Sequence, residues 1–298
     1  MEIMVNPRVD IAFKKIFGVE ENKDLLMSLL NAIVSEEDQI DELEILNPYN
    51  ERNFKNDKLS VLDIKARNKH DLTYFLIEMQ LSDETNYHKR GLYGWARVYS
   101  NQLSSGQPYE QLRKTIAIHI LNFTLIDYNQ TKGWKQYSPS KYHHRFVLQD
   151  KETGIEFFKD IEIHTIELIK FEGKGFATLE EIMAKVKVAL DRWMAFLTRC
   201  NMLDVNKLPS EVNIPEIKKA LHVAQEMSLN KLEKEMYDAH LDFLRMEAEA
   251  FEKKFLDGKI AGIAEGKLQI AKNMLTKGID TATIAEITGI TIEEIKKL

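Results

Sequence analysis

The sequence predicts an α/β fold in which helices flank a mixed central sheet, followed by an extension made only of helices. Three observations support this fold class. Apolar patterns of helix and strand type alternate up to about residue 178, and only helical patterns follow from Leu179. The chain has 298 residues and is 44% hydrophobic, so it can bury a sizeable core.

Helical and strand patterns follow one another in a clear order in the first part of the chain. Val9, Phe13 and Ile16 share one face of the first helix. Polar residues around Lys69 and His70 separate two strands as a hairpin turn does. The predicted elements are helices at 9–17 and 23–34, strands at 40–49, 58–68 and 72–81, a helix at 86–104, and strands at 114–123, 143–150 and 161–168.

In the helical extension, the apolar pattern predicts one helix over 179–200 and a long, charged helix over 229–255. A proline-containing boundary separates them. The long helix has an apolar seam that fits either a coiled-coil or homodimer contact, or a helix that lies back on the core. The seam residues are Leu232, Met236, Leu241, Leu244 and Phe251. The predicted domains are a core at 1–178, a helix closing the core at 179–208, a long charged helical region at 209–270 and a tail at 271–298.

Apolar residues in the tail have the spacing of a short helix-turn-helix. Ala285 and Ile295 fall on the two helices and Gly289 falls in the turn. Two interpretations stay open, contact with DNA and a small helical cap. Before the tail, glycine recurs at 258, 262 and 266, which indicates an adaptable helix or linker.

Composition argues against several classes of protein. No stretch approaches 18 consecutive apolar residues, so no membrane span is expected, and the N-terminus lacks the pattern of a signal peptide. Cys200 is the only cysteine, which excludes an internal disulfide and indicates a reducing cytoplasm. The formal net charge is −6, but residues 52–145 contain 15 Lys and Arg against 8 Asp and Glu, a local balance of +7. This basic block indicates either a phosphate-binding surface or uneven surface charge.

Two predicted strands carry acids inside apolar runs, within “VLDIKARNKHDLTYFLIEMQLS”. Strand alternation places Asp63 and Lys65 on one face of the first strand, and Glu78 and Gln80 on one face of the second. A hairpin that turns at residues 70–71 puts Asp63 nearly opposite Glu78. Two facing carboxylates repel unless a proton or a cation lies between them.

The acid pair predicts a Mg²⁺ site with Asp63 and Glu78 as ligands, because Mg²⁺ takes one or two carboxylates and keeps several waters. A metal there would activate water and stabilise charge on a scissile phosphate. The alternative for each acid alone is a carboxylate at a sheet edge, but the grouping with Lys65 and Gln80 favours the metal site. The histidines at 143–144 are expected to be surface or structural residues, because adjacent strand residues point to opposite faces.

The pattern D-x(14)-E-x-Q on a hairpin after a helix resembles the PD-(D/E)XK nuclease superfamily. More narrowly, the chain resembles the Rpn group of recombination-promoting nucleases, which are also called transposases. The stretches that carry the resemblance span nearly the whole chain. They are “VDIAFKKIFG”, “NDKLSVLDIKARN”, “FLIEMQ”, “YHKRGLYGWARVYSNQLSSGQPYEQL” and “AEGKLQIAKNMLTKGIDTATIAEITGITIEEIKKL”.

The resemblance implies a restriction-endonuclease-like core and a Mg²⁺-dependent DNA endonuclease that promotes recombination, with Mn²⁺ as a substitute metal. It implies that Asp63 and Glu78 are metal ligands and that Gln80 stands where the motif usually has Lys. It also implies that Asp10, in the first helix, helps the metal site.

This sequence departs from the superfamily motif at two places. Leu62 precedes Asp63 where the motif has Pro, and Gln80 cannot carry the positive charge of the usual Lys. Gln80 can orient the attacking water through its amide, and Lys65 can supply the charge. Within the Rpn group Gln is the usual residue at this place.

The helix at 86–104 carries cations soon after the acids. Lys89, Arg90 and Arg97 are predicted to hold DNA phosphates by charge-assisted hydrogen bonds. The alternative is a solvated basic face. The aromatic residues of this helix are expected to pack in the core; they are Tyr93, Trp95 and Tyr99.

The leading hypothesis is therefore a metal-dependent DNA endonuclease. An alternative from a different class is a non-catalytic DNA-binding or assembly protein on a nuclease-derived fold, which would use the basic block and the helical tail. A third interpretation makes the long helix a dimerisation or regulatory module.

Overall fold

The structure is a computed structural model of residues 1–298. It describes all of them except 1–4, 50–63, 83–85, 129–139 and 174–176. Asp63, one of the two acids predicted to bind metal, therefore lies outside the described residues.

The described strands form one mixed sheet of six strands, which confirms the predicted fold class. They are β1 (Leu43–Ile45), β2 (Ile64–Asn68), β3 (Tyr74–Gln80), β4 (Thr115–Leu121), β5 (His143–Val147) and β6 (Ile161–Glu167). The strand order is β1-β2-β3-β4-β6-β5. Neighbours among β1, β2 and β3 are antiparallel, β3, β4 and β6 are parallel, and β5 is antiparallel to β6.

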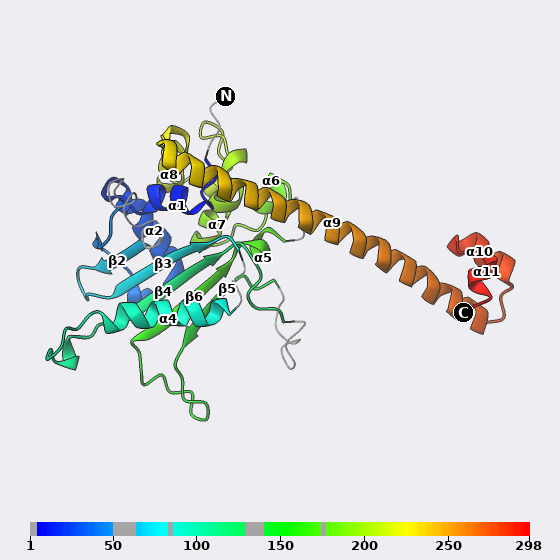
Figure 1. The fold of residues 1–298 in the computed structure, drawn as a ribbon, viewed down its shortest axis with the longest axis horizontal. Helices are drawn as coiled ribbons and strands as arrows, with labels where there is room; N and C mark the ends of the chain where they lie inside the picture. Colours follow the sequence, from blue (N-terminus) through cyan, green and yellow to red (C-terminus); the bar gives the residue numbers. More distant parts are fainter. Residues whose placement is uncertain (1–4, 50–63, 83–85, 129–139, 174–176) are drawn as a thin grey trace. The chain divides into compact units, whose positions relative to one another are not determined.

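Helices cover both faces of this sheet (Figure 1). The helix α4 lies on one face, and α1, α2 and α7 lie on the other. No helix in the described part of the chain is both long and apolar enough to cross a membrane. The helices are α1 (Asp10–Phe17), α2 (Lys23–Ile33), α4 (Tyr87–Ser100), α5 (Leu168–Glu172), α6 (Leu179–Met183), α7 (Ala189–Arg199), α8 (Pro215–Glu226), α9 (Lys231–Thr276), α10 (Thr281–Thr288) and α11 (Ile292–Ile295).

The apolar core lies on the sheet face opposite α4. Alternation along β3 sends Phe75 and Ile77 to that face, where both are fully buried. Phe17 of α1 and Trp193 of α7 meet there edge to face, with ring centroids 5.4 Å apart. Leu76 and Glu78 point to the opposite face, towards α4, and belong to the site described below.

The prediction of one helix over 179–200 is wrong, because the segment forms two helices, α6 and α7. The carboxylate of Asp191 accepts the backbone N–H groups of Lys187 and Val188, at 2.8 and 3.0 Å. These bonds hold the residues before α7 in an extended conformation, so α7 starts anew at Ala189. The prolines predicted to mark a boundary do so, and Pro215 begins α8.

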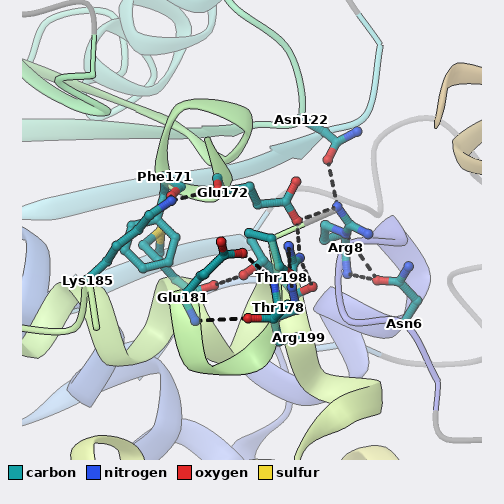
Figure 2. A network of polar contacts seen from close by, with 12 residues as sticks. Asn6, Arg8, Asn122, Phe171, Glu172, Thr178, Glu181, Lys185, Thr198 and Arg199 are labelled. Atoms are coloured by element: carbon teal, nitrogen blue, oxygen red, sulfur yellow. Dashed lines mark hydrogen bonds and ion pairs between the residues drawn. The ribbon is translucent and has the colours of Figure 1, made fainter. Parts of the chain in front are cut away.

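A polar network joins the segment before α1 to the ends of β4, α5 and α7 (Figure 2). Nη1 of Arg8 donates to Asn122 at 3.2 Å and lies 3.5 Å from the carboxylate of Glu172, which also accepts from Arg199 at 2.6 Å. The backbone N–H of Asn122 donates to the carbonyl of Gln80 at 2.9 Å. The network therefore supports the end of β3.

The chain divides into two compact units, residues 1–241 and 242–298, and the boundary falls within α9. In the second unit, Ala271, Ile284 and Ile295 form a small buried core. Gly289 follows α10 with a φ of 68°, a left-handed conformation that favours glycine. The predicted pair of short helices around a glycine turn is confirmed.

The first turns of α9 pack on the first unit. Glu233 is fully buried and accepts from Lys15 at 2.9 Å and from the hydroxyl of Tyr49. The backbone N–H of Asn6 donates to the hydroxyl of Tyr237 at 2.7 Å. The start of α9 therefore lies against the core through Glu233 and Tyr237, while the neighbouring seam residues Leu232 and Met236 are half-buried.

Candidate active site

The hairpin of β2 and β3 has the predicted register. Ile64 pairs with Ile77, Lys65 with Leu76 and Ala66 with Phe75. These pairs follow the register that the sequence predicts, in which Asp63 stands opposite Glu78. Asp63 itself lies outside the described residues.

Glu78 lies inside the sheet and not at its edge, because β3 runs between β2 and β4. The edge interpretation of this acid is therefore wrong. Glu78 is 6% exposed and pairs with His119 on β4. The hydroxyl of Tyr87 donates to its Oε2 at 3.3 Å, and Nδ1 of His119 lies 3.6 Å from the same oxygen.

The carboxyl of Glu78 is held in its ionised form. Burial by itself acts to raise its pKa. The influence of His119, the charge of Arg90 and the hydrogen bond from Tyr87 together outweigh burial, so the pKa of Glu78 lies below its usual value. An ionised carboxylate is thus present in the interior of the sheet, on a strand where Leu76 and Ile77 are buried apolar residues.

A pocket opens between β2, β3 and α4, and three predicted site residues line it. They are Lys65, Glu78 and Arg97. Gly94 lets α4 approach closely, since a Cβ there would lie 3.4 Å from Oε1 of Glu78. The pocket therefore combines one carboxylate with two cations. Its other lining residues are Leu76, Gly94, Val98 and Asn101.

Two of the predicted catalytic residues, Gln80 and Asp10, do not line this pocket. Gln80 is partly exposed at the end of β3, on the strand face that it shares with Glu78. Asp10 begins α1, and its Oδ2 lies 4.0 Å from Nδ1 of His240 in α9. Burial lowers the pKa of His240.

The predicted DNA-binding cations of α4 are all exposed. They are Lys89, Arg90 and Arg97. The aromatic residues of α4 are divided between its two sides. Trp95 donates to the carbonyl of Thr115 at 2.7 Å and Tyr99 donates to Asp160 at 2.6 Å, so both contact the sheet side. Tyr93 is 65% exposed, and the prediction that it packs in the core is wrong.

The adjacent histidines of β5 belong to the sheet. Nε2 of His143 lies 2.8 Å from Nδ1 of His164, and His144 bonds the hydroxyl of Tyr128. Burial lowers the pKa of both His143 and His144 to about 4. These contacts agree with a structural role.

The sequence reasoning missed Tyr87 and His119 as partners of Glu78. The signal for His119 was available, since it interrupts the apolar run “IAIHIL” as Glu78 interrupts “FLIEMQ”. The signal for Tyr87 was weaker, because tyrosine at the start of a helix is common.

Among the described residues of the pocket, the carboxylate of Glu78 is suited to be one ligand of a hard cation. The ionised oxygen of Glu78 suits Mg²⁺, which takes one or two carboxylates and otherwise keeps water. Within the described ranges, no group of three His, Cys, Asp or Glu side chains is arranged to hold a metal ion.

Two family models match the chain. One, described as PD-(D/E)XK nuclease family transposase, matches residues 7–253. The other, described as the C-terminal HTH domain of the Rpn/YhgA-like nuclease family, matches residues 264–298. No curated protein and no solved structure matches significantly.

Proposed function

Because the chain belongs to the PD-(D/E)XK nuclease family transposases, we propose that it is a Mg²⁺-dependent DNA endonuclease that promotes recombination. The observation that supports this best is the pocket in which Glu78 lies with Lys65 and Arg97. An ionised carboxylate beside two cations suits the binding of both a metal and a phosphate.

Glu78 and Asp63 are the proposed metal ligands. When bound, Mg²⁺ (or Mn²⁺) would supply a water of lowered pKa and stabilise charge on the phosphate. Lys65 supplies positive charge at the pocket, which Gln80 cannot do, and Gln80 orients water through its amide. Asp10 assists from the start of α1.

Lys89, Arg90 and Arg97 are the proposed contacts to DNA phosphates, because all three are exposed on α4. The HTH domain at residues 264–298 is a second proposed DNA contact. We place the activity in the reducing cytoplasm, since Cys200 is the only cysteine in the sequence and the chain therefore cannot form an internal disulfide.

A second copy of the chain is a further proposed partner, through α9. Apolar side chains are exposed along the part of α9 that lies in the second unit. They are Phe243, Met246, Phe255, Leu256, Ile260, Ile263, Leu268 and Ile270. A dimer contact would remove them from water.

Plasmid nicking with and without Mg²⁺ tests the function. The native protein should nick in Mg²⁺, and Asp63→Ala and Glu78→Gln should each lower the rate by about 10²-fold or more, since each removes a charge from the proposed metal site. Glu156→Gln, at an exposed carboxylate outside the site, is the control. Cleavage that survives both site substitutions would refute the assignment.

One observation favours a non-catalytic alternative, namely Gln80 at the place of the usual Lys. A DNA-binding or assembly protein on the same fold would bind DNA in a salt-dependent way and cut it in no divalent metal. The nicking assay distinguishes the two functions.

A further inference from the structure

The carboxylate of Glu78 is held from behind by two side chains that no motif assigns. Tyr87 is the first residue of α4, and His119 is the partner of Glu78 in the adjacent strand β4. The hydroxyl of Tyr87 lies 3.3 Å from Oε2 of Glu78 and 3.0 Å from Nδ1 of His119. The three side chains form a row of polar groups in a buried place, with exposed fractions of 6%, 2% and 1% for Glu78, Tyr87 and His119.

The hydrogen-bond geometry gives the row a direction. A tyrosine hydroxyl has one proton, and Tyr87 donates it to Glu78. The contact between His119 and the same hydroxyl then requires Nδ1 of His119 to donate. The direct distance from His119 to Glu78, 3.6 Å, is too long for a good hydrogen bond, so the imidazole acts through Tyr87.

Packing fixes both rings. Nε2 of His119 is buried, has no hydrogen-bond partner among the described residues, and faces α4 at Gly91, where a Cβ would lie only 3.0 Å away. The ring of Tyr87 packs edge to face against Phe123, with centroids 5.5 Å apart. Neither ring can turn without losing these contacts.

The two oxygens of Glu78 therefore have different surroundings. Oε2 accepts the hydrogen bond from Tyr87, whereas Oε1 lies on the side of Gly94, which lines the pocket. We infer that Tyr87 and His119 are positioning residues that hold Oε2 and so direct Oε1 of Glu78 to a divalent cation in the pocket. This inference rests on the proposed function, in which Glu78 is a metal ligand.

Tyr87→Phe is the direct test, because it removes the hydroxyl and keeps the ring. Partners that orient a metal ligand typically contribute 10–100-fold to metal affinity or activity. We expect Mn²⁺ binding to the full chain, measured by calorimetry, to weaken by about tenfold or more, and kcat for nicking to fall similarly with KM for DNA unchanged.

Tyr99→Phe is the matched control. It makes the same change in the same helix and removes a hydrogen bond to a carboxylate, that of Asp160, which is not part of the site. It should leave Mn²⁺ affinity and kcat unchanged. An equal effect of both substitutions would overturn the positioning role, because any loss of a tyrosine hydroxyl from α4 would then suffice.

Variants of His119 separate positioning from packing. His119→Asn keeps a donor near the place of Nδ1 and should retain most of the Mn²⁺ affinity, whereas His119→Leu should lose it. Combining His119→Leu with Tyr87→Phe should cost no more than either alone, because the two residues act in series. Equal affinity for His119→Asn and His119→Leu would contradict the inference.

The failure of the proposed function and the failure of this inference are distinguishable. Native nicking that Glu78→Gln abolishes and Tyr87→Phe leaves intact would overturn the inference alone. No cleavage and no Mn²⁺ binding by the native chain would refute the function. In that case nitrogen NMR of the metal-free protein decides: an Nδ1–H signal of His119 that Tyr87→Phe shifts supports the linkage, and an Nε2–H tautomer overturns it.

Discussion

The carboxylate of Glu78 can be buried inside the sheet because neighbouring side chains offset the free-energy cost of removing its charge from water. Burying a neutral polar group without a hydrogen bond costs on the order of 2–7 kcal/mol, and burying a charge without partners costs more. Here His119, Arg90 and Tyr87 lower the pKa of Glu78 against the effect of burial. The partners come from β4 and α4, so the ionised form of this one side chain depends on two other elements.

Histidines elsewhere in the sheet make the fold sensitive to acid. The pKa values of His143 and His144 fall to about 4 in the folded chain, chiefly because of burial, from an ordinary value of 6.5. Below pH 6.5 the unfolded chain binds protons on these residues that the folded chain does not, so stability decreases as pH falls from 6.5 towards 4.

We expect the free energy of unfolding, measured with urea, to be lower at pH 4.5 than at pH 7.5 by about 2 kcal/mol or more, at about 1.4 kcal/mol for each unit of pKa. Replacing both residues, His143→Gln and His144→Gln, should flatten this dependence. His70→Gln, at an exposed histidine, is the control. A pH dependence as large in the double variant as in the native chain would contradict this prediction.

At the level of elements, α4 reaches the sheet through its glycines. A Cβ at Gly91 would lie 3.0 Å from Nε2 of His119, and one at Gly94 would lie 3.3 Å from Leu76. Gly258 in α9 has nothing within 4 Å of such a Cβ. Gly91 and Gly94 therefore allow α4 to pack closely on the candidate site, whereas a side chain at Gly258 in α9 would meet no neighbour among the described residues.

Alanine substitution should therefore have opposite effects in these two helices. Gly258→Ala should stabilise the chain by up to about 1 kcal/mol through helix propensity. Gly91→Ala should destabilise it, because overpacking against His119 costs about 1–3 kcal/mol.

Thermal and urea unfolding of both variants check this prediction. Adding His119→Ala to Gly91→Ala should relieve the overpacking. A Gly91→Ala protein more stable than the native one would show that the His119 ring moves aside freely.

For the whole molecule, the division at residues 241 and 242 separates two tasks. The first unit holds the pocket, and it also holds the contacts of Glu233 and Tyr237 that fix the start of α9. The second unit holds the exposed apolar residues of α9 and the HTH domain.

A chain that ends at Leu241 should therefore fold, because it keeps those contacts of α9. We expect it to sediment as a monomer while the full chain sediments as a dimer, and to bind DNA at least tenfold more weakly because it lacks the HTH domain and the second copy. Sedimentation and filter binding at matched salt check this. Equal sedimentation behaviour would refute the proposed dimer contact.

Local patterns were sufficient where a single element sets the outcome. The turn expected at residues 70–71 gave the hairpin register. Alternation in β2 and β3 then gave the shared face of Lys65 and Glu78, because a strand repeats every two residues whatever surrounds it. Gly289 likewise marked a turn from its own conformational freedom.

Contacts between distant segments decided the rest. The burial of Glu78 depends on strands β2 and β4 on either side of it, and the exposure of Tyr93 depends on which side of α4 meets the sheet. The break before Ala189 is different, because it depends on a local contact that periodicity does not reveal, the bonds from Lys187 and Val188 to the carboxylate of Asp191. Periodicity names the residues that share a face, but it cannot say which neighbour covers that face.

The sequence by itself determined the fold class, the family resemblance and the acids worth testing, because these depend on residue type and spacing along the chain. Only the tertiary structure decided that Glu78 lies inside the sheet, that Arg97 reaches the same pocket, and that Tyr87 and His119 stand behind the carboxylate. The physical reason is that the pKa and the orientation of a buried side chain depend on charges and hydrogen-bond donors that come from elements distant in the sequence.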